Sequence, residues 1–141
     1  VEIGGEIKAQ GHKANNQNWL IGIEKPQSKR TIHHLITLKD QAIATSGDYR
    51  NYSQTAQGTF THTINPKTGD ALISRLLSVS VLAKECMEAD ATATALMVMG
   101  ENKAKEFVKV HKVPAMFIIQ EGKGLKTVMT ERFKKSLLRK A

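Results

Sequence analysis

The sequence predicts an α+β fold in which a mostly antiparallel sheet packs against helices. The first third of the chain alternates apolar and polar residues in short runs, a period of two that is typical of half-buried strands. The segment after Cys86 is instead rich in Ala, Leu and Met at helical spacing. A run of strands followed by helices mixed with further strands is the element order of α+β proteins.

The size and composition are those of one globular domain. The chain has 141 residues, of which 40% are hydrophobic and 24% charged, and this allows a hydrophobic core. We find no internal repeat and no linker, so we expect one unit over residues 1–141. The chain begins in mid-strand without a starting Met. We therefore expect sheet neighbours to be missing and the fold to be incomplete at its N-terminus.

The first half of the chain contains the clearest strand patterns. Residues 42–49 pass from a buried strand into a turn that contains Gly47, and residues 59–64 form another strand. The alternating runs and the polar segments between them predict strands at 1–9, 18–24 and 33–38, with turns at 11–17 and 25–29.

The second half mixes helices with strands. A buried strand at 78–83 precedes a helix that runs to about Met99. Gly100 ends this helix, because glycine is preferred just past a helix C-terminus. The remaining patterns predict an amphipathic helix at 101–112, strands at 113–120 and 125–129, and a short basic helix at 131–139.

Basic residues dominate the charge. The chain carries 21 Lys and Arg against 13 Asp and Glu, a net charge of +8, which attracts phosphates, nucleic acids or anionic membranes. The commoner explanation is a solvated basic face. Few aromatic residues interleave with the basic ones, so binding of single-stranded nucleic acid is not favoured. No apolar run reaches the roughly 18 to 20 residues of a membrane-spanning helix.

The most informative pair of side chains is Asp90 and Thr94. They are four residues apart in the predicted helix and so project from the same face. A carboxylate beside a hydroxyl suits a hard cation such as magnesium, which binds oxygen ligands and keeps waters or substrate phosphates in its shell. The alternative is that a helix N-terminus favours acidic residues even without a ligand, which is the commoner reason for an acid there.

His62 is the second candidate, near the end of the strand predicted at 59–64. An imidazole there can assist proton transfer near neutral pH, although a histidine at a strand end is more often structural. The remaining histidines show no metal-ligand spacing, so zinc is not indicated; they are His12, His33, His34 and His111.

Two glycine-containing segments lack known functional motifs. Gly4-Gly5 lets a backbone approach a ligand closely, but it has neither the G-x-G-x-x-G nor the P-loop pattern. Ser46-Gly47 lacks the G-x-S-x-G context of a nucleophile elbow.

Four ordered segments can be compared with known families. Residues 1–7 read VEIGGEI, 44–50 read ATSGDYR, 62–69 read HTINPKTG and 87–96 read MEADATATAL. In this order they resemble the VEIGGE strand, the ATSGDYR turn, the HxIDPxTG motif and the MEADALATAL helix of the ApbE family. Asn65 stands where the family often has Asp.

The resemblance implies a fold and an activity. The chain is similar to the carboxy-terminal part of an ApbE-like flavin transferase domain, and members of that family use magnesium to transfer FMN from FAD to a threonine hydroxyl of a target protein, releasing AMP. By the same resemblance, Asp90 and Thr94 hold magnesium together with a third ligand from the preceding part of the domain. His62 orients or deprotonates the acceptor hydroxyl, and Ile64 contacts FAD.

The resemblance also implies partners and a location. Acceptor proteins of the family include subunits of redox pumps, and its members are commonly lipid-anchored on the periplasmic side of the bacterial inner membrane. Membrane association would then depend on a lipoprotein anchor absent from this chain. Two alternatives stay open: a non-catalytic fragment that binds flavin or a partner, and a magnesium-dependent FAD pyrophosphatase that releases free FMN and AMP.

Overall fold

A computed structural model describes residues 1–26, 31–47, 52–55, 58–61, 64, 66–70 and 74–138. Its main feature is a six-stranded sheet in which every neighbouring pair of strands is antiparallel. The strands lie in the order β1 (Glu2–Ile3), β2 (Glu6–Ala9), β5 (Gln41–Gly47), β8 (Leu76–Ala83), β9 (Ala115–Glu121) and β10 (Gly124–Met129). Two further hairpins are β3 (Trp19–Glu24) with β4 (Ile32–Leu38), and β6 (Tyr52–Thr55) with β7 (Gly58–Thr61).

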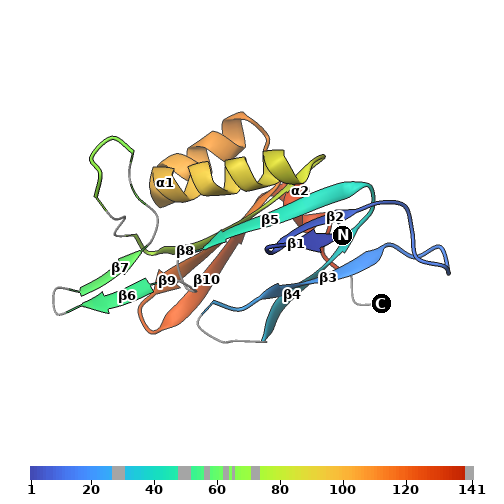
Figure 1. The fold of residues 1–141 in the computed structure, drawn as a ribbon, viewed down its shortest axis with the longest axis horizontal. Helices are drawn as coiled ribbons and strands as arrows, with labels where there is room; N and C mark the ends of the chain where they lie inside the picture. Colours follow the sequence, from blue (N-terminus) through green and yellow to red (C-terminus); the bar gives the residue numbers. More distant parts are fainter. Residues whose placement is uncertain are drawn as a thin grey trace.

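Helix α1 (Cys86–Val110) covers one face of this sheet (Figure 1). It contacts β5 and β8 most extensively. Apolar side chains of β8, β9 and α1 form the core on this side, among them Val79, Phe117 and Leu96, none of which is more than 1% exposed. The helix therefore packs by its apolar stripe, as the predicted periodicity requires.

The opposite face carries a second core beneath the β3–β4 hairpin and the short helix α2 (Glu131–Lys134) (Figure 1). Ile36 and Leu38 of β4 and Phe133 of α2 are fully buried there against Met116 and Ile118 of β9. Strand β9 is thus buried on both faces, which explains why its sequence is continuously apolar rather than alternating.

Gly100 interrupts α1 as predicted. Its φ of 75° and ψ of 171° are not helical, and an L side chain rarely adopts this left-handed φ. The helix continues after the kink and ends at His111, whose N–H donates to the carbonyl of Phe107. The prediction of two helical segments separated at Gly100 is confirmed.

Sequence predictions for two segments were wrong in detail. Residues 1–9 form two strands rather than one, because Gly4 and Gly5, at φ 66° and 107°, make a tight turn between β1 and β2. Strand β7 begins one residue before the strand predicted at 59–64 and pairs with β6 in a hairpin that was not predicted, while residues 62 and 63 lie outside the described residues. Residues 48 and 49, in the turn predicted after the buried strand that begins at residue 42, also lie outside the described residues.

The predicted helix at 131–139 is also too long, since α2 ends at Lys134. Leu137 instead forms a bridge with Ile36, and the N–H of Leu138 donates to the carbonyl of Leu35 at 3.0 Å. The backbone therefore pairs with β4, which satisfies polar groups that a longer helix would leave unpaired. None of the helices in the described part of the chain has the length and hydropathy needed to span a bilayer.

Candidate functional site

The first turns of α1 present Asp90 and Thr94 at the protein surface. Both residues are exposed, whereas Ala89 and Ala93, each one position earlier, are fully buried toward the sheet. This alternation follows from the helical period, because i and i+4 share a face. The structure therefore brings the two predicted ligands to the same side of the helix, above the end of β5.

The end of β5 supplies a third oxygen. Ser46 Oγ lies 3.0 Å from Thr94 Oγ1, within hydrogen-bond distance. The preceding residue, Thr45, points its hydroxyl at Ser80 Oγ on the neighbouring strand, at 2.8 Å. Ser46 and Thr94 are therefore held as a pair between strand and helix.

The turn between β1 and β2 contributes backbone and carboxylates. At Gly4 an added Cβ would lie 3.0 Å from Glu6 Oε2, in addition to facing a left-handed φ of 66°. A side chain at this position would therefore be strained and crowded. Glycine here keeps the turn narrow and leaves its backbone accessible.

These three segments, together with β3, line one cavity of about 440 Å³. Its size is within the range of small-molecule and cofactor sites. The polar lining consists of carboxylates and hydroxyls, and isoleucines provide most of the apolar lining. The described residues that line it are Glu2, Gly4, Gly5, Glu6, Ile7, Ile21, Gly22, Ile23, Glu24, Ile43, Thr45, Ser46, Gly47, Asp90 and Thr94.

The donor chemistry of this cavity fits magnesium and does not fit zinc. Asp90, Thr94 and Ser46 offer oxygen atoms only, the ligand type of a hard cation. Among the described residues no group of three or more His, Cys, Asp or Glu side chains has metal-binding geometry. A cation here would accordingly take few protein ligands and complete its shell with water or phosphate oxygens, as magnesium does.

The two other predicted site residues are not placed at this cavity. His62 lies outside the described residues. Ile64 is described and half exposed, but it is not among the described residues that line the cavity.

Sequence reasoning missed the contribution of Ser46, Glu2 and Glu6. In the sequence analysis, Ser46-Gly47 is tested only against a nucleophile motif. The carboxylates of Glu2 and Glu6 are assigned no role in a site there. The available signal was that Glu6 and Ser46 belong to two of the segments that carry the family resemblance. Segments far apart in sequence that match one family are expected to meet at its site.

A separate polar cluster ties the β3–β4 hairpin to the sheet. His33 Nε2 lies 2.8 Å from Thr127 Oγ1 of β10, and the rings of His33 and His34 meet edge to face at 4.4 Å. Burial lowers the pKa of both imidazoles below the ordinary 6.5, with smaller effects from His34 and Lys25 at His33. No described residue bonds to His34 Nδ1, which is buried.

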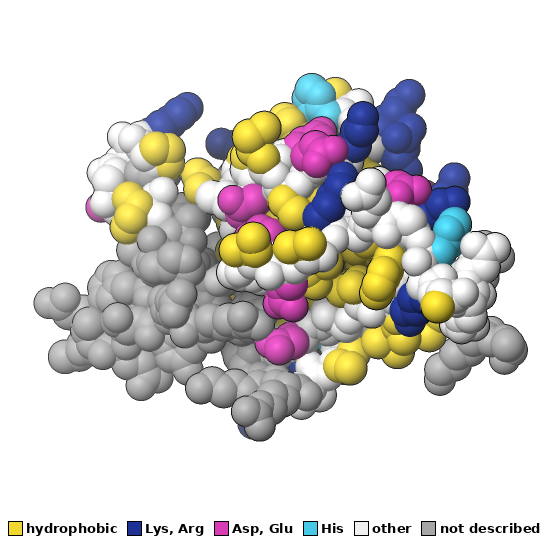
Figure 2. Space-filling model, turned by 45° about the vertical axis from the view of Figure 1, so that its right-hand side comes forward, with side chains coloured by type: hydrophobic (Ala, Val, Ile, Leu, Met, Phe, Trp, Pro, Cys, Tyr) yellow, Lys and Arg dark blue, Asp and Glu magenta, His cyan; other side chains and the backbone are white. Residues whose placement is uncertain are grey.

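The basic excess is spread through a surface of mixed charge. Figure 2 shows, on one face, Lys and Arg side chains interspersed with acidic and apolar ones. Lys105 pairs with Glu101 at 2.7 Å and Lys126 with Glu121 at 2.9 Å. Part of the positive charge is thus matched locally, as on an ordinary solvated surface.

A model of the ApbE family matches residues 1–117. The chain belongs to the ApbE family. The resemblance carried by the four motif segments is therefore confirmed. Three of these segments, at 1–7, 44–50 and 87–96, contribute described residues to the cavity described above.

Curated relatives of the chain are FAD:protein FMN transferases. The one from Vibrio cholerae is 42% identical over 135 residues, and the one from Salmonella typhimurium is 36% identical over 139 residues. These matches cover 95% and 98% of this chain but 40% of each relative. The chain thus spans about two fifths of the length of these ApbE relatives.

Solved ApbE structures share the fold. The flavin transferase ApbE from Vibrio cholerae superposes with a TM-score of 0.82 at 40% identity, covering 96% of this chain and 43% of that one. The ApbE protein from Thermotoga maritima gives 0.84 at 28% identity, covering 98% and 44%. The predicted α+β, ApbE-like architecture is confirmed.

Proposed function

We propose that this chain is the carboxy-terminal part of an enzyme that transfers FMN from FAD to a threonine hydroxyl of an acceptor protein, with magnesium and with release of AMP. Membership of the ApbE family and the names of its relatives support a flavin transferase. The threonine acceptor, the metal and the products are our proposal.

One observation carries the proposal: described residues of the family segments at 1–7, 44–50 and 87–96 meet at a single cavity whose polar side chains offer only oxygen atoms. A structural helix N-terminus would explain Asp90 alone. It would not explain why the hydroxyls of Thr94 and Ser46 lie 3.0 Å apart beside the same cavity. The convergence therefore favours a site for a metal-bound phosphate compound.

Asp90 and Thr94 would hold the magnesium ion. Their carboxylate and hydroxyl are exposed at the cavity, so phosphate oxygens can complete the shell. When bound, the ion would neutralise charge that develops on the pyrophosphate oxygens during transfer. Ser46 positions the Thr94 hydroxyl, and the Gly4-Gly5 turn leaves room for the substrate to approach.

The bonds that change follow from the substrate and products. The acceptor threonine oxygen attacks the flavin-side phosphorus of FAD, and a new P–O bond joins FMN to the protein. The pyrophosphate P–O bond breaks, and AMP leaves with its electron pair. His62 would accept the hydroxyl proton or orient that hydroxyl, and Ile64 would contact FAD.

The test uses a chimera in which this chain replaces the matched part of the Vibrio cholerae FAD:protein FMN transferase. The 42% identity over 135 residues makes this replacement conservative. The chimera is incubated with FAD, magnesium and the acceptor protein of the Vibrio cholerae enzyme. We expect covalent flavin fluorescence on the acceptor and one AMP released per flavin attached.

The products distinguish the alternatives. Free FMN with AMP and no labelled acceptor would show a pyrophosphatase instead. FAD binding without either product would show a non-catalytic flavin-binding fragment. Each result would overturn the transferase proposal, provided that the unaltered Vibrio cholerae enzyme labels the acceptor in parallel.

The His62→Ala variant tests the proton-transfer role. We expect a transfer rate lowered by about 100-fold, the size of a general base contribution, with a smaller change in FAD affinity. An unchanged rate would remove His62 from the mechanism. Ile64→Ala should instead weaken FAD affinity more than it slows transfer.

The location and acceptor class are proposals of the same kind. We propose that the protein acts on the periplasmic side of the bacterial inner membrane on subunits of redox pumps. Fractionation of cells, followed by detection of flavin-labelled proteins in the membrane fraction, would test both. Labelling confined to cytoplasmic proteins would contradict them.

A further inference from the structure

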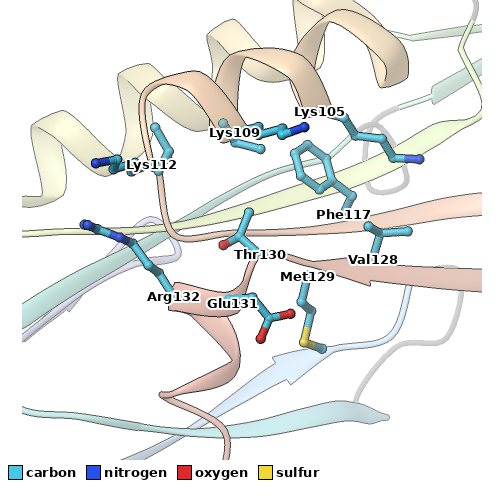
Figure 3. Close-up of a pocket in the computed structure, with 11 residues that line it drawn as sticks. Lys105, Lys109, Lys112, Phe117, Val128, Met129, Thr130, Glu131 and Arg132 are labelled. Atoms are coloured by element: carbon cyan, nitrogen blue, oxygen red, sulfur yellow. The ribbon is translucent and has the colours of Figure 1, made fainter.

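A second cavity, of about 450 Å³, lies between the last turns of α1, the β9–β10 hairpin and α2 (Figure 3). Its volume is within the range of about 300 to 1,000 Å³ found for ligand pockets. It shares no described lining residue with the cavity at Asp90. Its described lining is Lys105, Val108, Lys109, Lys112, Val113, Phe117, Val128, Met129, Thr130, Glu131 and Arg132.

The floor of this cavity is apolar. Val108 and Phe117 are buried parts of the core under α1, and the partly buried Val113 and Val128 pack against the same core. The side chain of Met129 packs instead against the core on the opposite face of the sheet. Thr130 is a polar residue of the lining, and its Oγ1 already accepts hydrogen bonds from the N–H groups of Ala115 and Phe133. The floor therefore offers contacts to an apolar group, and the Thr130 oxygen is already an acceptor in two hydrogen bonds.

The rim is cationic. Lys109, Lys112 and Arg132 are exposed and form no ion pair with any described residue, whereas Lys105 pairs with Glu101 at 2.7 Å. The one carboxylate in the described lining is Glu131, which pairs with Lys134 at 2.6 Å. Three unmatched cations thus surround an apolar floor.

Figure 3 shows the side chains of Lys112 and Arg132 extending toward the same side of the cavity, one from the turn after α1 and the other from α2. Lysines at a helix C-terminus are stabilised by the helix dipole without any ligand. Arg132 comes from a different element, so that effect does not account for the pair. A guanidinium beside an ammonium matches a carboxylate or phosphate head.

We propose that this cavity binds a small amphipathic anion, with a carboxylate or phosphate head at Lys112 and Arg132 and an apolar body against Val113 and Val128. Such a ligand matches the cavity in two ways: its anionic head matches the cationic rim, and its apolar body matches the apolar floor. The site is independent of the proposed flavin transfer because the two cavities share no described residue.

Binding is measured by calorimetry on the 141-residue chain and on the chimera, with octanoate, octyl phosphate, 1-octanol and inorganic phosphate as ligands. We expect saturable binding of octanoate or octyl phosphate, and the tighter of the two identifies the head. 1-Octanol, which lacks the charge, and inorganic phosphate, which lacks the apolar body, should each bind at least about tenfold more weakly.

The variant Lys112→Gln with Arg132→Gln should weaken binding of the anionic ligand by about tenfold, since two charge-assisted contacts are lost. The matched control is Lys103→Gln with Lys123→Gln, two exposed lysines that do not line the cavity. The control should bind normally, and both variants should keep the flavin transfer rate of the chimera.

Three results would overturn the proposal. Equal binding of 1-octanol and octanoate would show an apolar site without charge recognition. Equal losses in the two variants would show only a general effect of net charge. Binding by the isolated chain that disappears in the chimera would show that the rest of the ApbE domain covers the cavity.

Discussion

The hydroxyl of Ser46 lies 3.0 Å from the hydroxyl of Thr94. These residues are 48 positions apart in the sequence and belong to β5 and α1, which pack together through the buried face of the helix. The hydrogen bond restricts the rotamer of Thr94 at the cavity. The position of β5 beside α1 therefore helps to fix the orientation of Thr94, a proposed metal ligand.

We predict that Thr94→Val raises the magnesium concentration needed for transfer, because valine keeps the shape of threonine and removes its oxygen. Thr94→Ser should stay close to the parent, since the oxygen remains. Ser46→Ala removes a positioning partner and should weaken apparent magnesium affinity by about 10- to 100-fold. Magnesium titrations of the chimera's transfer rate measure all three. Parent-like behaviour of Thr94→Val would exclude Thr94 as a ligand.

Asp90→Asn should abolish magnesium-dependent FAD binding, since it removes the charge of the proposed carboxylate ligand, which lies at the cavity on the same helix face as Thr94. The matched control is Glu88→Gln, which removes the same charge two positions earlier, in the exposed first turn of α1. Glu88 does not line the cavity. Flavin fluorescence with and without magnesium separates the variants. Equal effects at both positions would indicate a helix-dipole effect in place of a metal site.

The histidine pair predicts how stability depends on pH. Burial lowers the pKa values of folded His33 and His34 below 6.5, the value that applies to the unfolded chain. Below pH 6.5 the unfolded state therefore binds more protons than the folded state, and stability falls as the pH decreases from 6.5 toward the folded pKa values. Above that window the contribution is complete.

Urea unfolding between about pH 8 and pH 5 measures this effect. The double variant His33→Gln with His34→Gln should show a flatter dependence than the parent, while His12→Gln, at an exposed position, should not. A parent-like slope in the double variant would assign the pH dependence to other groups.

Gly100→Ala should destabilise the fold by about 1 to 2 kcal/mol, because alanine is strained at a left-handed φ. In the described part of the chain, no atom outside the neighbouring residues and the local helix backbone lies within 4 Å of the added Cβ, so the cost is conformational and not a clash. Gly124→Ala is the control, since its φ is not left-handed and its Cβ would make an ordinary contact at 3.6 Å. Its change should stay within about 0.5 kcal/mol. Urea midpoints that fall equally would refute the assignment.

Local patterns predicted much of this fold because each had one physical cause. The i,i+4 spacing put Asp90 and Thr94 on one helix face, and glycine marked the kink at Gly100. The alternation of apolar and polar residues in β4 indicates a strand with one buried face, and Ile36 and Leu38 are fully buried. These features depend on neighbours in sequence.

The features that could not be predicted depend on distant partners. The backbone after Lys134 leaves the helix because Leu35 and Ile36 offer it bonding groups, and no local pattern reports this. The Ser46 contact with Thr94 requires β5 to lie under α1. The cavity at Asp90 also depends on contacts between distant segments, so the spacing of residues does not predict it. The resemblance of several segments to one family is the signal that indicates it.

The pairing of Gly47 with Ser78 gives the segment between β5 and β8 a particular evolutionary freedom. β5 ends and its antiparallel neighbour β8 begins at the same end of the sheet. The last residues of β5 and the first residues of β8 therefore stay adjacent whatever lies between them. Closing a longer excursion costs little, since the entropy of closure grows only with the logarithm of its length. The stretch that carries His62 and Ile64 can therefore lengthen, shorten or be exchanged while the sheet that holds Asp90 and Thr94 keeps its register.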